Sequence, residues 1–158
     1  MSVEPALEII AATAADLDTV RTLFRAYQRW LGISLDFQDF DAELADLPGK
    51  YAAPTGALLL ARAAGDVAGV VALRPLEGGL CEMKRLYVLP EFQGRGIGRA
   101  LAVAIVDAGR RAGYRAMRLD TMARMKAAVA LYRGLGFVEI APYTFNPEPD
   151  VIFFERML

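Results

Sequence analysis

The sequence predicts a domain of the α/β or α+β class, with helices on the faces of one mixed, mostly antiparallel sheet. Three strand-like segments separated by short turns lie between residues 56 and 89, which predicts an antiparallel meander. From residue 80 onward a strand, a helix and a strand follow in series, which predicts a right-handed parallel crossover. The chain has 158 residues and no repeat or long linker, so we expect one domain over residues 1–158.

The first half of the chain opens with a short strand, expected at 7–11. A helix follows from Asp16, its expected N-cap, to about Leu31, and Gly32 ends it. Its apolar residues recur every three or four positions and form one stripe: Leu17, Val20, Leu23, Phe24, Tyr27 and Leu31. A shorter helix is expected at 37–47, because Pro48 and Gly49 stop it.

The remaining elements follow from alternation, helical spacing and glycine or proline stops. Strands are expected at 56–63, 67–74, 80–89, 114–121, 137–140 and 151–157. Helices are expected at 98–111 and 125–135.

Composition excludes several classes of protein. Hydrophobic residues make up 55% of the chain and charged residues 23%, which excludes an intrinsically disordered protein. Lys and Arg total 18 against 19 Asp and Glu, and a formal charge of −1 argues against a nucleic-acid partner. With no histidine, histidine triads and carboxylate–histidine–zinc sites are excluded. The single cysteine, Cys81, excludes an intrachain disulfide, and we expect no metal.

The location of the protein follows from its apolar segments. The segment Met1–Leu7 lacks the basic and apolar regions of a signal sequence. No apolar run approaches the ~20 residues that span a bilayer. We therefore expect a cytoplasmic protein without a membrane partner.

A glycine-rich loop carries the chemistry. Gly94, Gly96 and Gly98 follow a strand and open a helix. Glycines allow successive amides to point into one concavity, and the first turn of a helix adds unpaired amides and a partial positive charge. Such a place binds phosphate, and Arg95 and Arg99 can add charge-assisted contacts. The alternative is a tight strand–helix connection with both arginines in solvent.

Two nucleotide-binding motifs do not fit this loop. In the dinucleotide fingerprint the third glycine comes one position later than Gly98, and too little chain follows for a full doubly wound sheet. Asp120 follows the glycines by about 20 residues, as a ribose-binding acid would, but this residue alone does not make the fingerprint fit. The phosphate-loop motif fails because Gly49-Lys50 is followed by Tyr51.

The segment Gln93-Gly94-Arg95-Gly96-Ile97-Gly98 does resemble the Q/R-x-x-G-x-G/A signature of the GNAT superfamily of acyl-CoA-dependent N-acetyltransferases. A second resemblance, to the A-x-x-L-Y-x-x-x-G-F helix of that family, begins at Ala128 and ends at Phe137. Many members carry asparagine three residues before that alanine, whereas this chain has Met125, so one contact to the cofactor is missing.

The resemblance implies a fold, a cofactor and a site. The fold is a sheet with a splayed pair of parallel strands, and the cofactor is acetyl-CoA, the acyl donor. The backbone of Leu86, Tyr87 and Val88 would bind the pantetheine arm at the splay. The signature, with its amides from Gly94 onward, would bind the pyrophosphate: Gln93, Gly94, Arg95, Gly96, Ile97, Gly98 and Arg99. Tyr132 would lie near the thioester sulfur and protonate the leaving thiolate.

Residue chemistry adds a candidate base. An amine with a pKa near 10.4 is almost fully protonated at pH 7, and without histidine the candidate bases are carboxylates. Glu82 is the choice, because some histone-type members of the family place a glutamate at this spacing before the signature. We expect partial burial to raise its pKa. The alternative is an ion pair with Lys84 or Arg118, or a solvated edge.

Tyr132, with a pKa near 10, is matched to protonating a thiolate, and its alternative is a tyrosine packed under the sheet. Cys81 alternates with Glu82, and we expect it in the core.

The expected function is transfer of an acetyl group to a primary amine, most simply that of a small molecule. Tyr27, Trp30, Tyr143 and Asn146 are candidate substrate contacts, and each of these could instead be core or rim. The open alternatives are a non-catalytic module that senses acyl-CoA and a protein or peptide N-acetyltransferase. The apolar final strands favour a homodimer.

Overall fold

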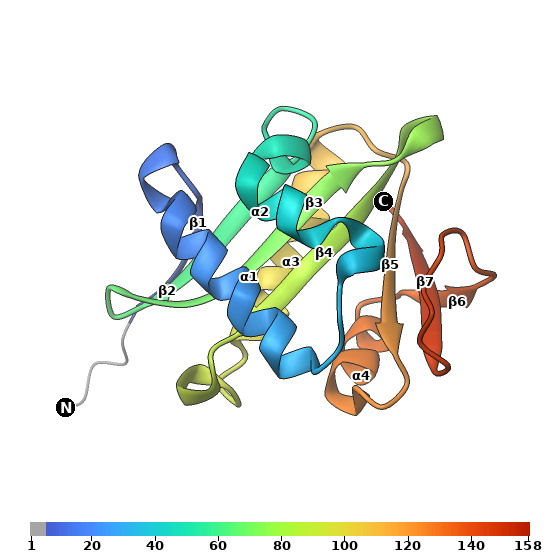
Figure 1. Ribbon diagram of the computed structural model, residues 1–158. Helices are drawn as coiled ribbons and strands as arrows, with labels where there is room; N and C mark the ends of the chain where they lie inside the picture. The colour runs from blue at the N-terminus through green and yellow to red at the C-terminus, as the bar shows by residue number, and fades with distance from the viewer. Residues whose placement is uncertain (1–5) are drawn as a thin grey trace.

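The computed structural model describes residues 6–158 and confirms the predicted class, a seven-stranded mixed sheet with helices on both faces (Figure 1). Within residues 6–158 the strand order is β1-β2-β3-β4-β5-β7-β6, and β4 and β5 are the only neighbours there that pair in parallel. The strands are β1 (Leu7–Ala11), β2 (Ala57–Ala63), β3 (Asp66–Pro75), β4 (Leu80–Val88), β5 (Ala116–Met122), β6 (Val138–Ile140) and β7 (Val151–Met157). Most of the segment Met1–Leu7, in which no signal sequence is expected, lies outside the described residues.

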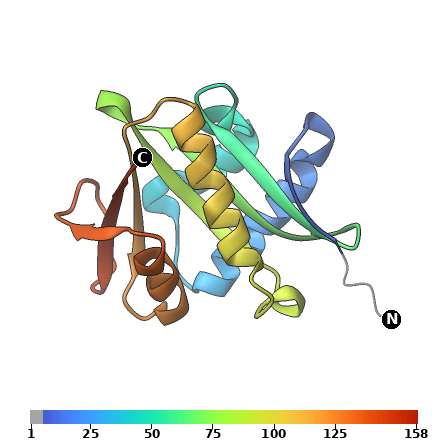
Figure 2. The same cartoon turned by 180° about the vertical axis from the view of Figure 1, so that it is seen from behind.

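The helices divide between the two faces of the sheet. Helices α1 (Leu17–Leu31) and α2 (Phe40–Asp46) cover one face (Figure 1). Helices α3 (Ile97–Arg111) and α4 (Lys126–Gly134) cover the other, where α3 crosses the middle of the sheet (Figure 2). Each face therefore has its own core.

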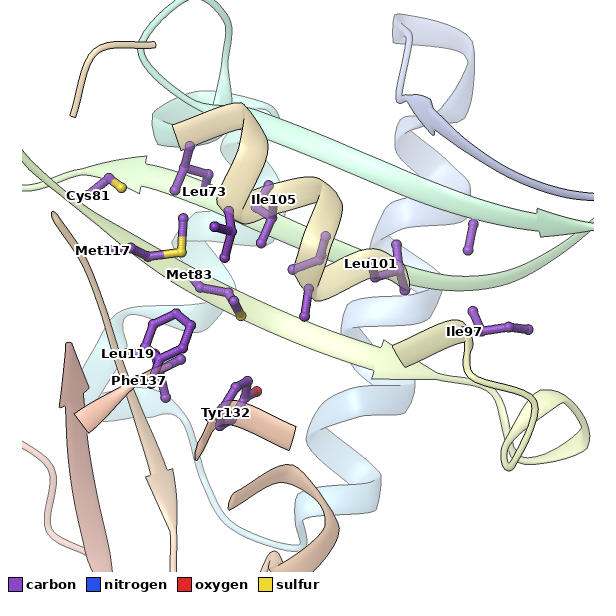
Figure 3. Close-up of a cluster of buried hydrophobic side chains, with 14 of the residues drawn as sticks. Leu73, Cys81, Met83, Ile97, Leu101, Ile105, Met117, Leu119, Tyr132 and Phe137 are labelled. Carbon is purple, nitrogen blue, oxygen red and sulfur yellow. The ribbon is translucent and has the colours of Figure 1, made fainter. Parts of the chain in front are cut away.

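Alternation along β4 assigns its side chains to these two cores. Cys81 and Met83 pack under α3 with Leu101, Ile105 and Met117 (Figure 3). Glu82 and Lys84, between and beyond them, turn to the face that carries α1 and α2. Cys81 is fully buried, and burial raises the pKa of its thiol to about 12, so the expected core position is confirmed.

Three local predictions differ from the structure. The single helix expected at 37–47 is broken at Asp39, whose φ of 53° is left-handed, so that a 3-10 turn (Asp36–Gln38) precedes α2. Asp16 does not cap α1 with its side chain; its carboxylate accepts a hydrogen bond from Thr13 N, at 2.8 Å, one turn earlier. The strand expected from residue 114 begins at Ala116.

Strands β4 and β5 pair only at their start. The register runs from Leu80 opposite Ala116 to Glu82 opposite Arg118, and no further pair follows. Beyond that point β4 follows β3, while β5 stays paired with β7 as far as Met122. Because each strand follows a different neighbour, the two diverge in a V (Figure 1). A bulge at Arg85, with φ of 62°, adds to the bend of β4. The predicted splayed pair is thus confirmed.

Candidate active site

The glycine-rich loop joins the end of β4 to α3. Gly94 and Gly96 have φ of 79° and 78°, a left-handed backbone that favours glycine. A side-chain carbon added at either position would meet no atom within 4 Å, so the space outside this backbone is open. The Gln93 amide Nε2 donates to Val88 O at 3.0 Å and ties the loop back to β4. Local geometry therefore holds the loop in place with open space beside Gly94 and Gly96.

The amides of this loop have no carbonyl partner. Within residues 6–158 no backbone carbonyl accepts a hydrogen bond from the amides of residues 94–99. Ala100 N is the first to find one, Gly96 O at 3.1 Å. The partial positive charge of the α3 N-terminus adds to these donors, and so do the exposed side chains of Arg95 and Arg99. This donor set fits the diphosphate of coenzyme A.

The gap between β4 and β5 opens into a cleft that passes through the sheet. From the α3 side Met83, Leu86, Leu119 and Tyr132 line it. From the other side it is lined by Tyr27, Trp30, Phe37, Gln38, Lys84, Asp120 and Asn146. On the edge that faces β5, β4 has no ladder partner after Glu82, so the backbone of Leu86 and Val88 is available there. An extended chain could pair with that edge.

Tyr132 reaches the cleft from α4. Its ring packs against Phe137 and Phe154, with centroids 5.9 and 6.3 Å away, beside the core under α3 (Figure 3). Burial raises the pKa of Tyr132 above its ordinary value of 10, so the matched pKa that we expected is wrong. The hydroxyl stays protonated at neutral pH, as a donor to a thiolate must.

Glu82 is fully buried and held by three neighbours. Its Oε1 accepts from Arg74 Nε at 2.7 Å, its Oε2 accepts from the Tyr143 hydroxyl at 2.5 Å, and Lys84 Nζ lies 3.8 Å from Oε1. Burial alone would raise the pKa of Glu82, but Lys84, the Tyr143 hydrogen bond and Arg74 together hold it below its usual value. The raised pKa expected for this carboxyl is therefore wrong.

The alternatives for Glu82 were an ion pair, with Lys84 or Arg118, and a solvated edge. The ion pair with Lys84 is present, and the burial of Glu82 excludes a solvated edge. Arg118 pairs instead with Glu155 at 2.8 Å.

Comparison of the sequence with models of protein families identifies the family of this chain. A model of the acetyltransferase (GNAT) family matches residues 17–137. The chain belongs to this family. An uncharacterised N-acetyltransferase of Schizosaccharomyces pombe is 42% identical over 140 residues, which cover 87% of this chain and 86% of that protein. An IAA acetyltransferase of Azospirillum brasilense is 36% identical over 144 residues, which cover 89% of this chain and 92% of that protein.

A solved structure shares the fold. A putative acetyltransferase from Salmonella typhimurium, solved with its cofactor acetyl-CoA, has a TM-score of 0.72 and 23% identity. The similarity covers 96% of this chain and 94% of that chain. The expected family, its acyltransferase chemistry and its fold are thus confirmed, whereas the roles of single residues stay predictions.

The predicted site residues of this GNAT acetyltransferase fall into three groups. The backbone groups and Tyr132 lie along the cleft and its loop. The side chains of Tyr87 and Ile97 are buried, and Tyr87 is also paired with Val70 of β3, so its backbone does not face the open edge of β4. Tyr27 and Trp30 line the cleft beside Tyr87, with ring centroids 6.2 and 5.6 Å from it. Tyr143 and Asn146 reach over the face that carries α1 and α2, where they contact Glu82 and Asp120.

Sequence reasoning missed several polar residues of the site. Arg74, on β3, was not considered as a partner of Glu82. Arg85 is nearly buried, and its guanidinium donates to both oxygens of Glu43, at 3.0 Å each. Asp120 was considered only as a ribose-binding acid. The alternation of β4 and β5 was the available signal, because it places Glu82 and Lys84 on one face and Arg118 and Asp120 beside them.

The described residues contain neither a metal centre nor a membrane-spanning helix. Among residues 6–158, no three His, Cys, Asp or Glu side chains are grouped to hold a metal ion. No helix in that part of the chain has the length and apolar character needed to cross a membrane.

Proposed function

We propose that this GNAT acetyltransferase transfers the acetyl group of acetyl-CoA to the primary amine of a small molecule by direct attack. The observation that carries the proposal is the set of free amides at residues 94–99, which follows β4, the strand whose Leu86 lines the cleft between β4 and β5. Acetyl-CoA supplies a thioester, which an uncharged amine can attack. The relative solved with acetyl-CoA supports this donor.

The loop and the open strand edge would position the donor. The amides of Gly94 to Arg99 would hold the diphosphate, with Gln93 bracing the loop. The free edge of β4 would bind the amide-bearing arm through Leu86 and Val88, as a further strand does, while Tyr87 between them stays paired with β3. These contacts direct the thioester into the cleft, toward Tyr132.

At that point the amine nitrogen forms a bond to the carbonyl carbon and the carbon–sulfur bond breaks. The nitrogen loses a proton, and the sulfur gains one. Tyr132 is the donor to the sulfur. Because burial raises the pKa of Tyr132, its hydroxyl acts first as a hydrogen-bond donor to the charge that develops on sulfur.

Glu82 is the proposed base for the acceptor amine. Its lowered pKa keeps it ionised at neutral pH, which a base requires. Glu82 is fully buried and is not among the residues that line the cleft, so the proton reaches it through a water rather than directly. Tyr27, Trp30, Tyr143 and Asn146 would contact the acceptor. The exposed Val138, on the edge strand β6, and the exposed Met157, on β7 beside it, support the predicted homodimer.

The test combines acetyl-CoA binding with thiol release over a panel of small amines. We expect acetyl-CoA to raise the melting temperature, and at least one amine to release the free thiol of coenzyme A in step with the acetylated product. A shift in melting temperature without release for any amine or peptide would favour the acyl-CoA sensor. Release with a peptide alone would favour the protein or peptide acetyltransferase.

A further inference from the structure

Lys84 and Asp120 occupy equivalent positions on the two diverging strands. The last pair between β4 and β5 is Glu82 opposite Arg118, and each of the two residues lies two positions further on its own strand. Because side chains alternate along a strand, both turn to the face of α1 and α2. Both line the cleft. They are therefore the first residues on this face whose side chains lie on opposite sides of the opening between β4 and β5.

The two side chains carry opposite charges but do not neutralise each other. Among residues 6–158, the ion pair of Lys84 within 4.0 Å is with Glu82, and Asp120 forms none within that distance. Lys84 Nζ donates to Gln38 Oε1 at 3.1 Å and lies 3.8 Å from Glu82, although its side chain is only 10% exposed. Asp120 Oδ2 accepts from Asn146 Nδ2 at 3.0 Å. Both retain hydrogen-bonding capacity toward the cleft, since an ammonium has three donors and a carboxylate about four acceptor sites.

The other charges near the opening are already paired. Arg74 binds Glu82, and the Arg85 guanidinium binds both carboxylate oxygens of Glu43. A buried ammonium and a carboxylate facing an open cleft are costly in free energy unless a bound partner supplies opposite charge and hydrogen bonds to them. A partner that can bind both side chains is a small molecule that carries a negative and a positive group close together.

We propose that the acceptor is a free amino acid, whose carboxylate binds Lys84 and whose amino group binds Asp120. This inference rests on the proposed transferase function and names its substrate class. The amino group is held at the opening of the splay, on the opposite side of the cleft from Tyr132. Asn146 and Gln38 orient the two charged side chains through the contacts given above.

The test measures kcat/KM by thiol release for three matched acceptors: an amino acid, its amide and the amine that lacks the carboxyl group. We expect the wild type to prefer the free amino acid over its amide by about ten-fold or more, as for a charge-assisted hydrogen bond in a poorly solvated site. Lys84→Gln brings this ratio close to one. Lys84→Arg keeps the cation and restores part of the preference. Asp120→Asn lowers kcat/KM for all three acceptors and leaves the ratio above one.

Asp66→Asn, at the exposed first residue of β3, is the matched control and leaves every value at the wild-type level. A merely structural role of Lys84 would lower all acceptors together, so the ratio separates recognition from folding. The proposal is overturned if the wild type uses the amide as well as the amino acid, or if Lys84→Gln keeps the wild-type ratio. Release with simple amines but without carboxylate preference refutes the substrate class alone. No release with any amine refutes the transferase proposal as well.

Discussion

Replacement of Gly96 by aspartate tests the phosphate-binding role of the loop most directly. With φ of 78°, any L-residue at this position costs about 1–2 kcal/mol. That cost lowers the melting temperature by roughly 2–8 °C for a domain of this size. The Cβ of the new side chain would meet no atom within 4 Å, so the fold accommodates its attachment. Its charge, however, stands in the concavity that would hold the diphosphate.

The effect on binding follows from Coulomb's law. A carboxylate about 5 Å from one phosphate charge adds about 3 kcal/mol of repulsion at an effective dielectric constant of 20, or roughly a 100-fold loss of affinity. At a concentration of acetyl-CoA 100 times its Kd, the wild type gains about 2.7 kcal/mol, which raises the melting temperature by roughly 5–10 °C. Gly96→Asp gains only about 0.4 kcal/mol at that concentration, or about 1 °C.

The assay is a thermal shift with acetyl-CoA, supported by calorimetric titration. Gly113→Asp is the matched control, because Gly113 also has a positive φ, of 91°, and open space around it, but lies beyond the other end of α3. We expect it to lose a similar amount of stability in the free protein and to keep the full shift. Gly96→Ala separates strain from charge. A wild-type shift in Gly96→Asp, or an equal loss in Gly113→Asp, would refute the reasoning.

Three further predictions concern catalysis and stability. Tyr132→Phe keeps the ring packing and lowers kcat by about 100-fold with little change in acetyl-CoA affinity; equal losses in both would exclude the donor role. Glu82→Gln leaves Arg74 and Lys84 without their anion and lowers the free energy of unfolding by about 3 kcal/mol at pH 7. The pKa of Glu82 is lowered by folding, so its contribution is present above the unfolded pKa near 4.3 and is lost as pH falls below it. Urea unfolding from pH 7 to 3 should show the two proteins converge, and a constant difference would contradict this. Gly109→Val overpacks α3 against Met117, Leu158 and Cys81 and costs about 2 kcal/mol, with the Kd for acetyl-CoA unchanged.

Glu82 illustrates why part of the site could not be predicted. Sequence position suggested a carboxylate of raised pKa, because burial alone has that effect. The cations that reverse the effect come from the adjacent strand β3 and from β4 itself, and the Tyr143 hydroxyl comes from the segment between β6 and β7. Tyr143 is 61 residues from Glu82 in the sequence, and Arg74 meets it only through the pairing of β3 with β4, so only the folded chain shows that all of these groups meet.

Local physics explains what the sequence determined by itself. The apolar stripe of α1, the alternation of β4 and the glycine-rich turn before α3 depend on residues within a few positions of one another, and all three were predicted correctly. Tertiary structure decided the break at Asp39, the pairing of Arg85 with Glu43, and the divergence of β4 from β5 that leaves Lys84 facing Asp120. These features arise where distant segments compete for hydrogen-bond partners and for burial of charge, and that competition is resolved only when the whole sheet has formed.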